Sequence, residues 1–169
     1  MRDAARLGDG WFPYYVARDR FASWVPELRN LRRDEGLDPD AFTVLGGPTV
    51  SVQADPAKAK KTVAANVAWY VAAMGDVYAN SLRKQGYADA VEAVIAANPK
   101  SVPGGMVVPP EAEVLLEQLT AYGSPGDVAA GLAAWDSAVD VNMLGLVPGT
   151  PWDEIEAILK AGAPTRVDT

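Results

Sequence analysis

The residue types in this chain limit the chemistry that its side chains could perform. Its 169 residues include neither cysteine nor histidine. Their absence excludes disulfides, thiol nucleophiles, Ser-His pairs and the usual zinc sites. A catalyst built from this chain alone would have to use carboxylates, lysine or tyrosine, or carry its reactivity on a bound cofactor.

The charged side chains form no obvious catalytic group. Asp9 stands between two glycines, a context that favours a tight turn over an acid–base role. Three acids near the C-terminal end fit the preference of carboxylates for a first helical turn better than a metal site. They are Asp153, Glu154 and Glu156. The lysine cluster predicts a solvated helix face rather than a binding patch; it comprises Lys58, Lys60 and Lys61. We therefore expect no metal site.

The glycine pairs and the tryptophans also favour structural roles. Neither Gly46-Gly47-Pro48 nor Gly104-Gly105 has the spacing of a phosphate-binding loop. Three tryptophans are most simply core or interface aromatics. They are Trp69, Trp135 and Trp152.

Composition and charge exclude several broad classes of protein. Hydrophobic residues make up 49% of the chain, enough for one packed domain over residues 1–169. The net charge of −7 disfavours nucleic-acid binding. The sequence has no apolar run of about 18 residues for a membrane span, and its N-terminus lacks the apolar stretch of a secretory signal. We expect a cytoplasmic protein without membrane contact.

Hydrophobic spacing predicts helices that alternate with strands. One helix has the apolar face Phe21, Trp24, Val25, Leu28 and Leu31, with Ser23 as its cap, Pro26 in its first turn and Gly36 at its end. Further helices are expected over residues 3–7, from Pro56 onward, and over 76–85, 88–97 and 125–138, with one more after Pro151. Strands are expected over 11–15, over 42–52 with an interruption at 46–48, and over 141–147. Residues 98–110 predict a functional or mobile loop.

Two segments carry the same helix-start signal. Ser124-Pro125-Gly126-Asp127 and Thr150-Pro151-Trp152-Asp153 each place a hydroxyl before proline and an acid three residues later. This pattern predicts that Ser124 and Thr150 are helix caps and not catalytic hydroxyls. Pro164 is expected to follow the end of the last helix.

The order of elements predicts an α/β fold built from parallel βα units. About three strands are visible. A sheet of that size with open edges is a poor domain by itself, because its outer strands have unpaired backbone groups. The chain is therefore expected to form part of a larger parallel sheet or barrel.

Three stretches resemble luciferase-like flavin- or deazaflavin-dependent oxidoreductases. AARLGDGWFP resembles the family's helix and sixth barrel strand, FTVLGGPTVSVQADP and the helix after it resemble the seventh, and the stretch from YGSPGDVAAGL to ILKAGAP resembles the closing C-terminal pattern. The resemblance implies the C-terminal part of a (β/α)8 TIM-type barrel, left incomplete because strands one to five have no counterpart. It therefore implies a truncated or split form of such a protein.

The resemblance also implies a chemistry and a site. Family members use FMN or coenzyme F420 for hydride transfer or monooxygenation of a small-molecule substrate, and this part alone is not expected to bind either cofactor tightly. In a βα barrel the working face is formed by the C-terminal ends of the strands. Tyr14 and Tyr15 follow the first predicted strand, so they are the candidates to line the cofactor or substrate. The alternative is that both are core or rim aromatics.

A second interpretation of the whole chain is non-catalytic. A half-barrel could serve as an interaction module that completes its sheet with a partner or a second copy. Under either interpretation the open strand edges predict a homo-oligomer, binding to a complementary half-barrel, or aggregation.

Overall fold

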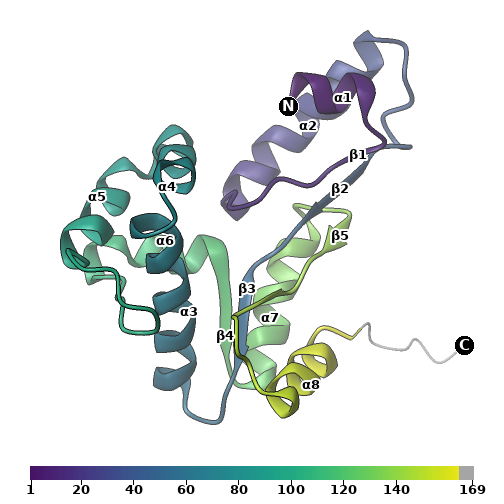
Figure 1. Ribbon diagram of the computed structural model, residues 1–169. Coiled ribbons are helices and arrows are strands. Elements are labelled where there is room, and N and C mark those ends of the chain that lie inside the picture. The colour runs from purple at the N-terminus through teal and green to yellow at the C-terminus, as the bar shows by residue number, and fades with distance from the viewer. Residues whose placement is uncertain (164–169) are drawn as a thin grey trace, which may run out of the picture.

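The computed structural model describes residues 1–163 as an α/β structure, with α3 to α6 on one side of the strands and α7 and α8 on the other (Figure 1). Pro164 lies outside the described residues. The elements follow in the order α1 (Arg2–Leu7), β1 (Gly10–Trp11), α2 (Arg18–Asp34), β2 (Thr43–Gly46), β3 (Thr49–Val52), α3 (Pro56–Ala72), α4 (Asp76–Leu82), the wide turn η1 (Arg83–Tyr87), α5 (Ala88–Ala97), the short turn η2 (Pro110–Ala112), α6 (Glu113–Leu119), β4 (Thr120–Gly123), α7 (Pro125–Asp136), β5 (Val141–Asn142), β6 (Gly145–Leu146) and α8 (Trp152–Ala161).

The strands form two parallel sheets that follow one another along the same chain segments. β2 lies between β1 and β5, and β3 lies between β4 and β6. Residues 45–46 pair with 141–142 and residues 49–50 pair with 145–146, so the register is unchanged across the break. The β5–β6 segment therefore lies along the whole β2–β3 segment. The parallel α/β prediction is confirmed, and no closed barrel forms within residues 1–163.

The break between the two sheets depends on glycine at residue 47. The carbonyl oxygens of Gly46 and Pro48 accept hydrogen bonds from the amides of Met143 and Gly145, at 2.8 and 2.9 Å. A Cβ atom on Gly47 would overlap the carbonyl oxygen of Met143. The predicted interruption of the strand is thus the point where two backbones approach most closely, which only glycine permits.

The expected strands differ from the observed ones in extent. The strand predicted over 11–15 is limited to β1, because Pro13 has no amide hydrogen for a ladder. The strand predicted over 141–147 is divided into β5 and β6. Moreover, β4 was not expected, although it pairs with β3 along its full length. It follows α6 directly, so no glycine or proline separates helix from strand.

Helix α2 begins earlier than predicted. Its first residue is Arg18, with Ala17 at the N-cap position, and Pro26 lies inside the helix. The predicted cap at Ser23 is therefore wrong: its hydroxyl donates to the carbonyl of Arg20 at 3.0 Å. Pro26 is exposed, so the carbonyl that loses its helical partner can reach water.

A buried arginine of α2 joins this helix to α1, and an ion pair joins it to the first sheet. Arg32 is 7% exposed and donates to the carbonyls of Ala5 and Gly8, each at 2.9 Å. Arg29 contacts Asp140 at 2.7 Å, and Asp140 accepts from the amide of Val44 at 2.8 Å. These contacts hold the N-terminal parts of β1, β2 and β5, at the end of the sheet opposite the candidate site.

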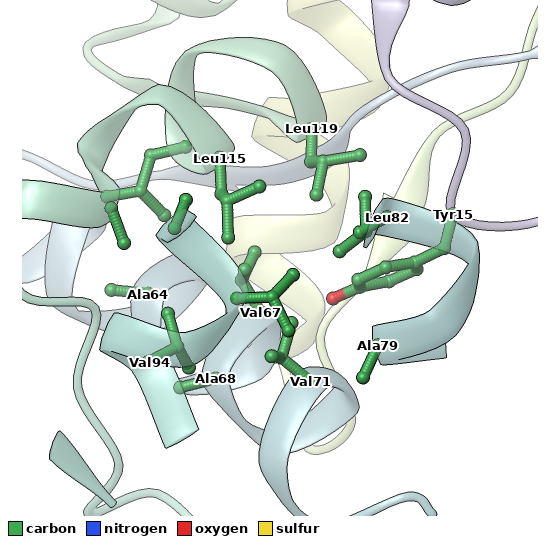
Figure 2. Packing of buried hydrophobic residues seen from close by; sticks show 14 of the residues in the cluster. Tyr15, Ala64, Val67, Ala68, Val71, Ala79, Leu82, Val94, Leu115 and Leu119 are labelled. Carbon is green, nitrogen blue, oxygen red and sulfur yellow. The ribbon is translucent and has the colours of Figure 1, made fainter. Parts of the chain in front are cut away.

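The apolar core is divided into three clusters. The largest lies among α3 to α6 and includes Tyr15 (Figure 2). A second packs Phe21 and Leu28 of α2 against Trp135, and a third lies between β3, α7 and α8. Within residues 1–163 no helix combines the length and the apolar character needed to cross a membrane.

Candidate functional site

A cavity of about 170 Å³ lies where the strands of the first sheet end. Its walls are residues 12–16 after β1, 47–49 after β2 and 143–145 after β5, together with Phe21 and Leu119. Parallel α/β folds bind ligands at the C-terminal ends of their strands. We call this space the tyrosine cavity, because both sequence-predicted residues, Tyr14 and Tyr15, line it.

Tyr14 and Tyr15 belong to a cluster of four tyrosines. Tyr70 comes from α3 and Tyr78 from α4. Ring centroids are 5.4 Å apart for Tyr14 and Tyr15, 4.7 Å for Tyr15 and Tyr70, and 4.9 Å for Tyr70 and Tyr78. These separations suit favourable aromatic pairs. The cluster connects the tyrosine cavity with the core formed by α3 and α4.

The two predicted residues have different environments. Tyr15 is 7% exposed, and its ring enters the core beside Ala79 and Leu82 (Figure 2). Tyr14 is 52% exposed. The burial of Tyr15 agrees with the core-aromatic alternative, whereas Tyr14 keeps a ring face that a ligand could reach.

Tyr15 combines an unusual backbone conformation with a buried hydroxyl group. Its φ of 58° lies in the left-handed region, which costs a residue with a side chain about 1 kcal/mol or more. Its hydroxyl is buried and has no hydrogen-bond partner among residues 1–163. Burial, reinforced by Tyr14, Tyr70 and Tyr78, raises the pKa of the Tyr15 phenol well above its ordinary value.

Gln85 fixes the backbone around Tyr15. This side chain is 2% exposed and lies in η1. Its Oε1 accepts from the amide of Ala17 at 2.8 Å, and its Nε2 donates to the carbonyl of Tyr15 at 3.1 Å and to Ser81 Oγ at 3.0 Å. Gly86, with a φ of 97°, turns the chain beside it. Gln85 is thus a positioning residue for the segment that carries both tyrosines.

A larger cavity of about 530 Å³ lies beside α3. One wall is the α3 face from Lys58 to Trp69, another is Pro103-Gly104 in the loop before η2, and the third is Val147-Pro148 after β6. We call it the lysine cavity. The predicted solvated face of α3 is therefore partly a cavity wall, and Lys60 on another side of the helix pairs with Glu113.

Of the other acidic residues considered from the sequence, two have side-chain partners and Asp9 is bonded through its backbone. Asp9 is exposed, and its backbone carbonyl accepts from the amide of Thr43 at 3.1 Å. Glu154 accepts from Ser51 Oγ at 2.8 Å, and Glu156 pairs with Lys160 at 2.7 Å. Residues 1–163 contain no group of three or more acidic side chains that could hold a metal ion.

One of the two predicted caps is confirmed. Ser124 Oγ accepts from the amide of Asp127 at 3.3 Å, and the Asp127 carboxylate accepts from the amide of Ser124 at 2.9 Å, a reciprocal capping box. Thr150 is not a cap: α8 begins at Trp152 after Pro151, and the Thr150 hydroxyl donates to the carbonyl of Val147 at 2.7 Å. That bond closes the turn before the helix.

The tryptophans occupy three different environments. Trp135 is 1% exposed in the core, and Trp69 is half-buried at the lysine cavity. Trp152 is 72% exposed, so it is not a core residue.

Sequence reasoning missed Tyr70, Tyr78 and Gln85. Tyr70 looked like one more apolar position on the face of α3. Tyr78 and Gln85 lie in a short helix and a wide turn, and no local pattern brings them to Tyr15. A polar residue inside an otherwise helical stretch, followed by Gly86, was the available signal for a kink.

A flavin-type cofactor fits the tyrosine cavity only in part. Sites that enclose ligands of that size span about 300–1,000 Å³, whereas this cavity holds about 170 Å³. None of the residues that line it is charged, so it offers no cation to a phosphate group. For a flavin-type ring, the described residues provide one aromatic wall, which includes the exposed ring of Tyr14.

Comparison with solved structures shows the fold. An F420-dependent tetrahydromethanopterin reductase from Methanopyrus kandleri matches 95% of this chain with 46% of its own, at 19% identity and a TM-score of 0.66. An EDTA monooxygenase from Chelativorans sp. BNC1 matches 95% with 39% of its own, at 16% identity and a TM-score of 0.59. A riboflavin lyase, solved with modified FMN and riboflavin, matches 94% with 39% of its own, at 18% identity and a TM-score of 0.52. This chain thus spans less than half of each.

The family is shown by the sequence itself. No curated protein matches the chain significantly. A family profile described as luciferase-like monooxygenase matches residues 1–141, which is most of the chain and includes the tyrosine segment, Gln85 and the strands from β1 to β4. The parallel α/β fold agrees with that match, and the chain belongs to the luciferase-like monooxygenase family.

Proposed function

We propose that this chain forms part of the barrel of a flavin- or F420-dependent oxidoreductase, with Tyr14 beside the redox ring or the substrate. The cofactor would supply the redox chemistry, either hydride transfer or monooxygenation of a small molecule, and the protein would orient it. Family membership and the F420- and FMN-associated structures support this choice of cofactor.

One observation carries the proposal. Tyr14 is 52% exposed at the C-terminal end of β1 and lines the tyrosine cavity, at the end of the strands where barrel enzymes place their active sites. Beneath it, Tyr15 and Gln85 hold the segment in place.

The rest of the site would come from further polypeptide, either a longer chain or a separate half-barrel. The chain spans 46% of the F420-dependent reductase and its sheets do not close within residues 1–163. The edge formed by β5 and β6 exposes Val141, Met143 and Leu146, at 42%, 37% and 43%. Unpaired apolar edges favour association. The proposal therefore includes that this chain associates with a second copy or with a complementary half-barrel.

A non-catalytic role as an interaction module is the second candidate, and the same apolar edge favours it. Sedimentation velocity at low micromolar concentration distinguishes an associating chain from a monomer. A monomer that unfolds cooperatively would contradict the open edge and an interaction module that completes its sheet with a second copy.

Flavin titration tests the enzymatic proposal. We expect the unmodified chain to bind FMN or F420 with a dissociation constant weaker than about 1 μM, because one wall forms few contacts. Tyr14→Ala should weaken this binding further, and Trp152→Ala, which removes an exposed ring outside the tyrosine cavity, should not. Equal affinities for Tyr14→Ala and the unmodified chain would contradict the proposal.

A further inference from the structure

We propose that the lysine cavity binds an elongated organic anion that carries a flat apolar group. This would be a second site, because no residue lines both the lysine cavity and the tyrosine cavity. Its volume of about 530 Å³ lies within the range of about 300–1,000 Å³ that is usual for small-molecule pockets. Figure 1 shows the loop that follows α5 passing beside α3.

The chemistry of the α3 wall changes along the helix. Lys58 and Lys61 lie toward its start, Asn66 follows, and Trp69 lies toward its end. Spacings of three, eight and eleven residues place these side chains on one helical face. At 1.5 Å per residue, Lys58 and Trp69 are separated by about 16 Å along the axis. A ligand that contacts both must therefore be long, anionic at one end and apolar at the other.

The two lysines are available for an anion. Neither forms an ion pair with any part of residues 1–163, whereas Lys60 between them in the sequence pairs with Glu113. Asp55, the acid at the start of α3, accepts from the backbone amides of Ala57 and Lys58. Two unpaired cations on one cavity wall, in a chain with a net charge of −7, favour a negatively charged ligand group.

The apolar part of the wall suits a ring. Trp69 is half-buried, Ala65 is buried, and Val147 and Pro148 face them from the segment after β6. A flat ligand group between Trp69 and these residues would gain aromatic stacking and apolar burial.

Hydrogen bonds anchor two walls of the cavity, the loop and α3. The loop is closed at its base by Asn98, whose Nδ2 donates to the carbonyl of Val107 at 2.8 Å and whose Oδ1 accepts from the Val107 amide at 2.9 Å. In the α3 wall, Thr62 Oγ1 accepts from Gln53 Nε2 at 3.1 Å, which joins the helix to the end of β3. Anchored walls reduce the entropy that is lost on binding.

Calorimetric titration of the full chain with biphenyl-4-carboxylate tests the proposal. We expect saturable binding at one site, and replacement of both lysines by Lys58→Gln and Lys61→Gln should weaken it by about tenfold. The matched control replaces Lys84 and Lys160, which are exposed and do not line the cavity, by glutamine, with no expected change. Trp69→Leu should also weaken binding, with circular dichroism to confirm folding.

Two further ligands test separately how much the negative charge and the ring system of the ligand contribute to binding. The neutral biphenyl-4-methanol should bind more weakly than the carboxylate, and inorganic phosphate should bind more weakly still. The proposal would be overturned by no saturable binding of the carboxylate, by equal affinity for the Lys58 and Lys61 variant, or by a neutral alcohol that binds as tightly. Phosphate binding as tight as that of the carboxylate would overturn the role assigned to Trp69.

Discussion

Gln85 and Tyr15 are 70 residues apart in the chain and are joined by a hydrogen bond of 3.1 Å from Gln85 Nε2 to the Tyr15 carbonyl. The same side chain accepts from the amide of Ala17. A buried side-chain amide thus binds the backbone on both sides of Val16, directly after Tyr15, whose φ is 58°. The strained conformation at the end of β1 is maintained by an element from another part of the fold.

Replacing Gln85 by leucine should destabilise the protein. The Tyr15 carbonyl and the Ala17 amide would lose their buried partner, at a cost of about 2 kcal/mol in the free energy of unfolding. Urea unfolding measures this change, and near-ultraviolet circular dichroism reports the tyrosine cluster. Gln118→Leu is the control, because Gln118 accepts from the exposed amide of Asp19. Equal losses in the two variants would show that Gln85 does not hold this segment.

Tyr15→Phe should leave stability unchanged or raise it by up to about 1 kcal/mol at neutral pH, because the removed hydroxyl is buried and finds no partner in the described part of the chain. Thermal unfolding of the variant and the unmodified chain gives the difference. A loss above about 1 kcal/mol would mean that the hydroxyl has a bonding role.

Alkaline pH should lower the stability of the folded protein through Tyr15. Because folding raises the Tyr15 pKa, the folded state retains a proton that the unfolded state loses above a pH of about 10. Stability is therefore fully present below that pH and falls as the pH rises further. Unfolding measured from neutral pH into this range should show a steeper decline for the unmodified chain than for Tyr15→Phe. Parallel curves would contradict this assignment.

Gly47→Ala should destabilise the protein by about 3 kcal/mol, because the new methyl group meets backbone rather than a movable side chain. Gly126→Ala, in the first turn of α7, is the matched control. Its Cβ would meet only Ser124 Oγ at 3.8 Å, so the change should be neutral or stabilising by up to about 1 kcal/mol. Chemical unfolding of both variants compares them; a tolerated Gly47→Ala would mean that β5–β6 can move away from β2–β3.

Ser124→Ala should lower the free energy of unfolding by about 1 kcal/mol, because it removes the cap of α7. Thr150→Ala removes no cap, because α8 begins after Pro151. The pKa of Asp127 is lowered by its hydrogen bonds to the side chain and backbone of Ser124. The stability from this pair is present above the unfolded carboxyl pKa of about 4 and is lost as the pH falls through the lower folded value. The effect of Ser124→Ala should therefore shrink in acid, and a pH-independent effect would argue against the pair.

Local signals predicted the parts of the structure that local chemistry determines. Ser124 and Asp55 cap their helices because their side chains reach amides in the next turn. Thr150 has the same flanking pattern, but its hydroxyl donates to the Val147 carbonyl and does not cap α8. The sequence placed Tyr14 and Tyr15 at a strand end, and it could not bring Tyr70, Tyr78 or Gln85 to them, because those contacts depend on how α3, α4 and η1 pack.

The position of Tyr14 beside a flavin-type ring is the central claim, and intermolecular nuclear Overhauser effects test it most directly. Weak binding is sufficient for this measurement with the isotope-labelled full chain and excess FMN. We predict contacts between the methyl protons of the flavin ring and the ring protons of Tyr14, and their loss in Tyr14→Ala. Contacts to Trp69 in the lysine cavity in place of Tyr14, or no contact to the tyrosine segment, would contradict the account.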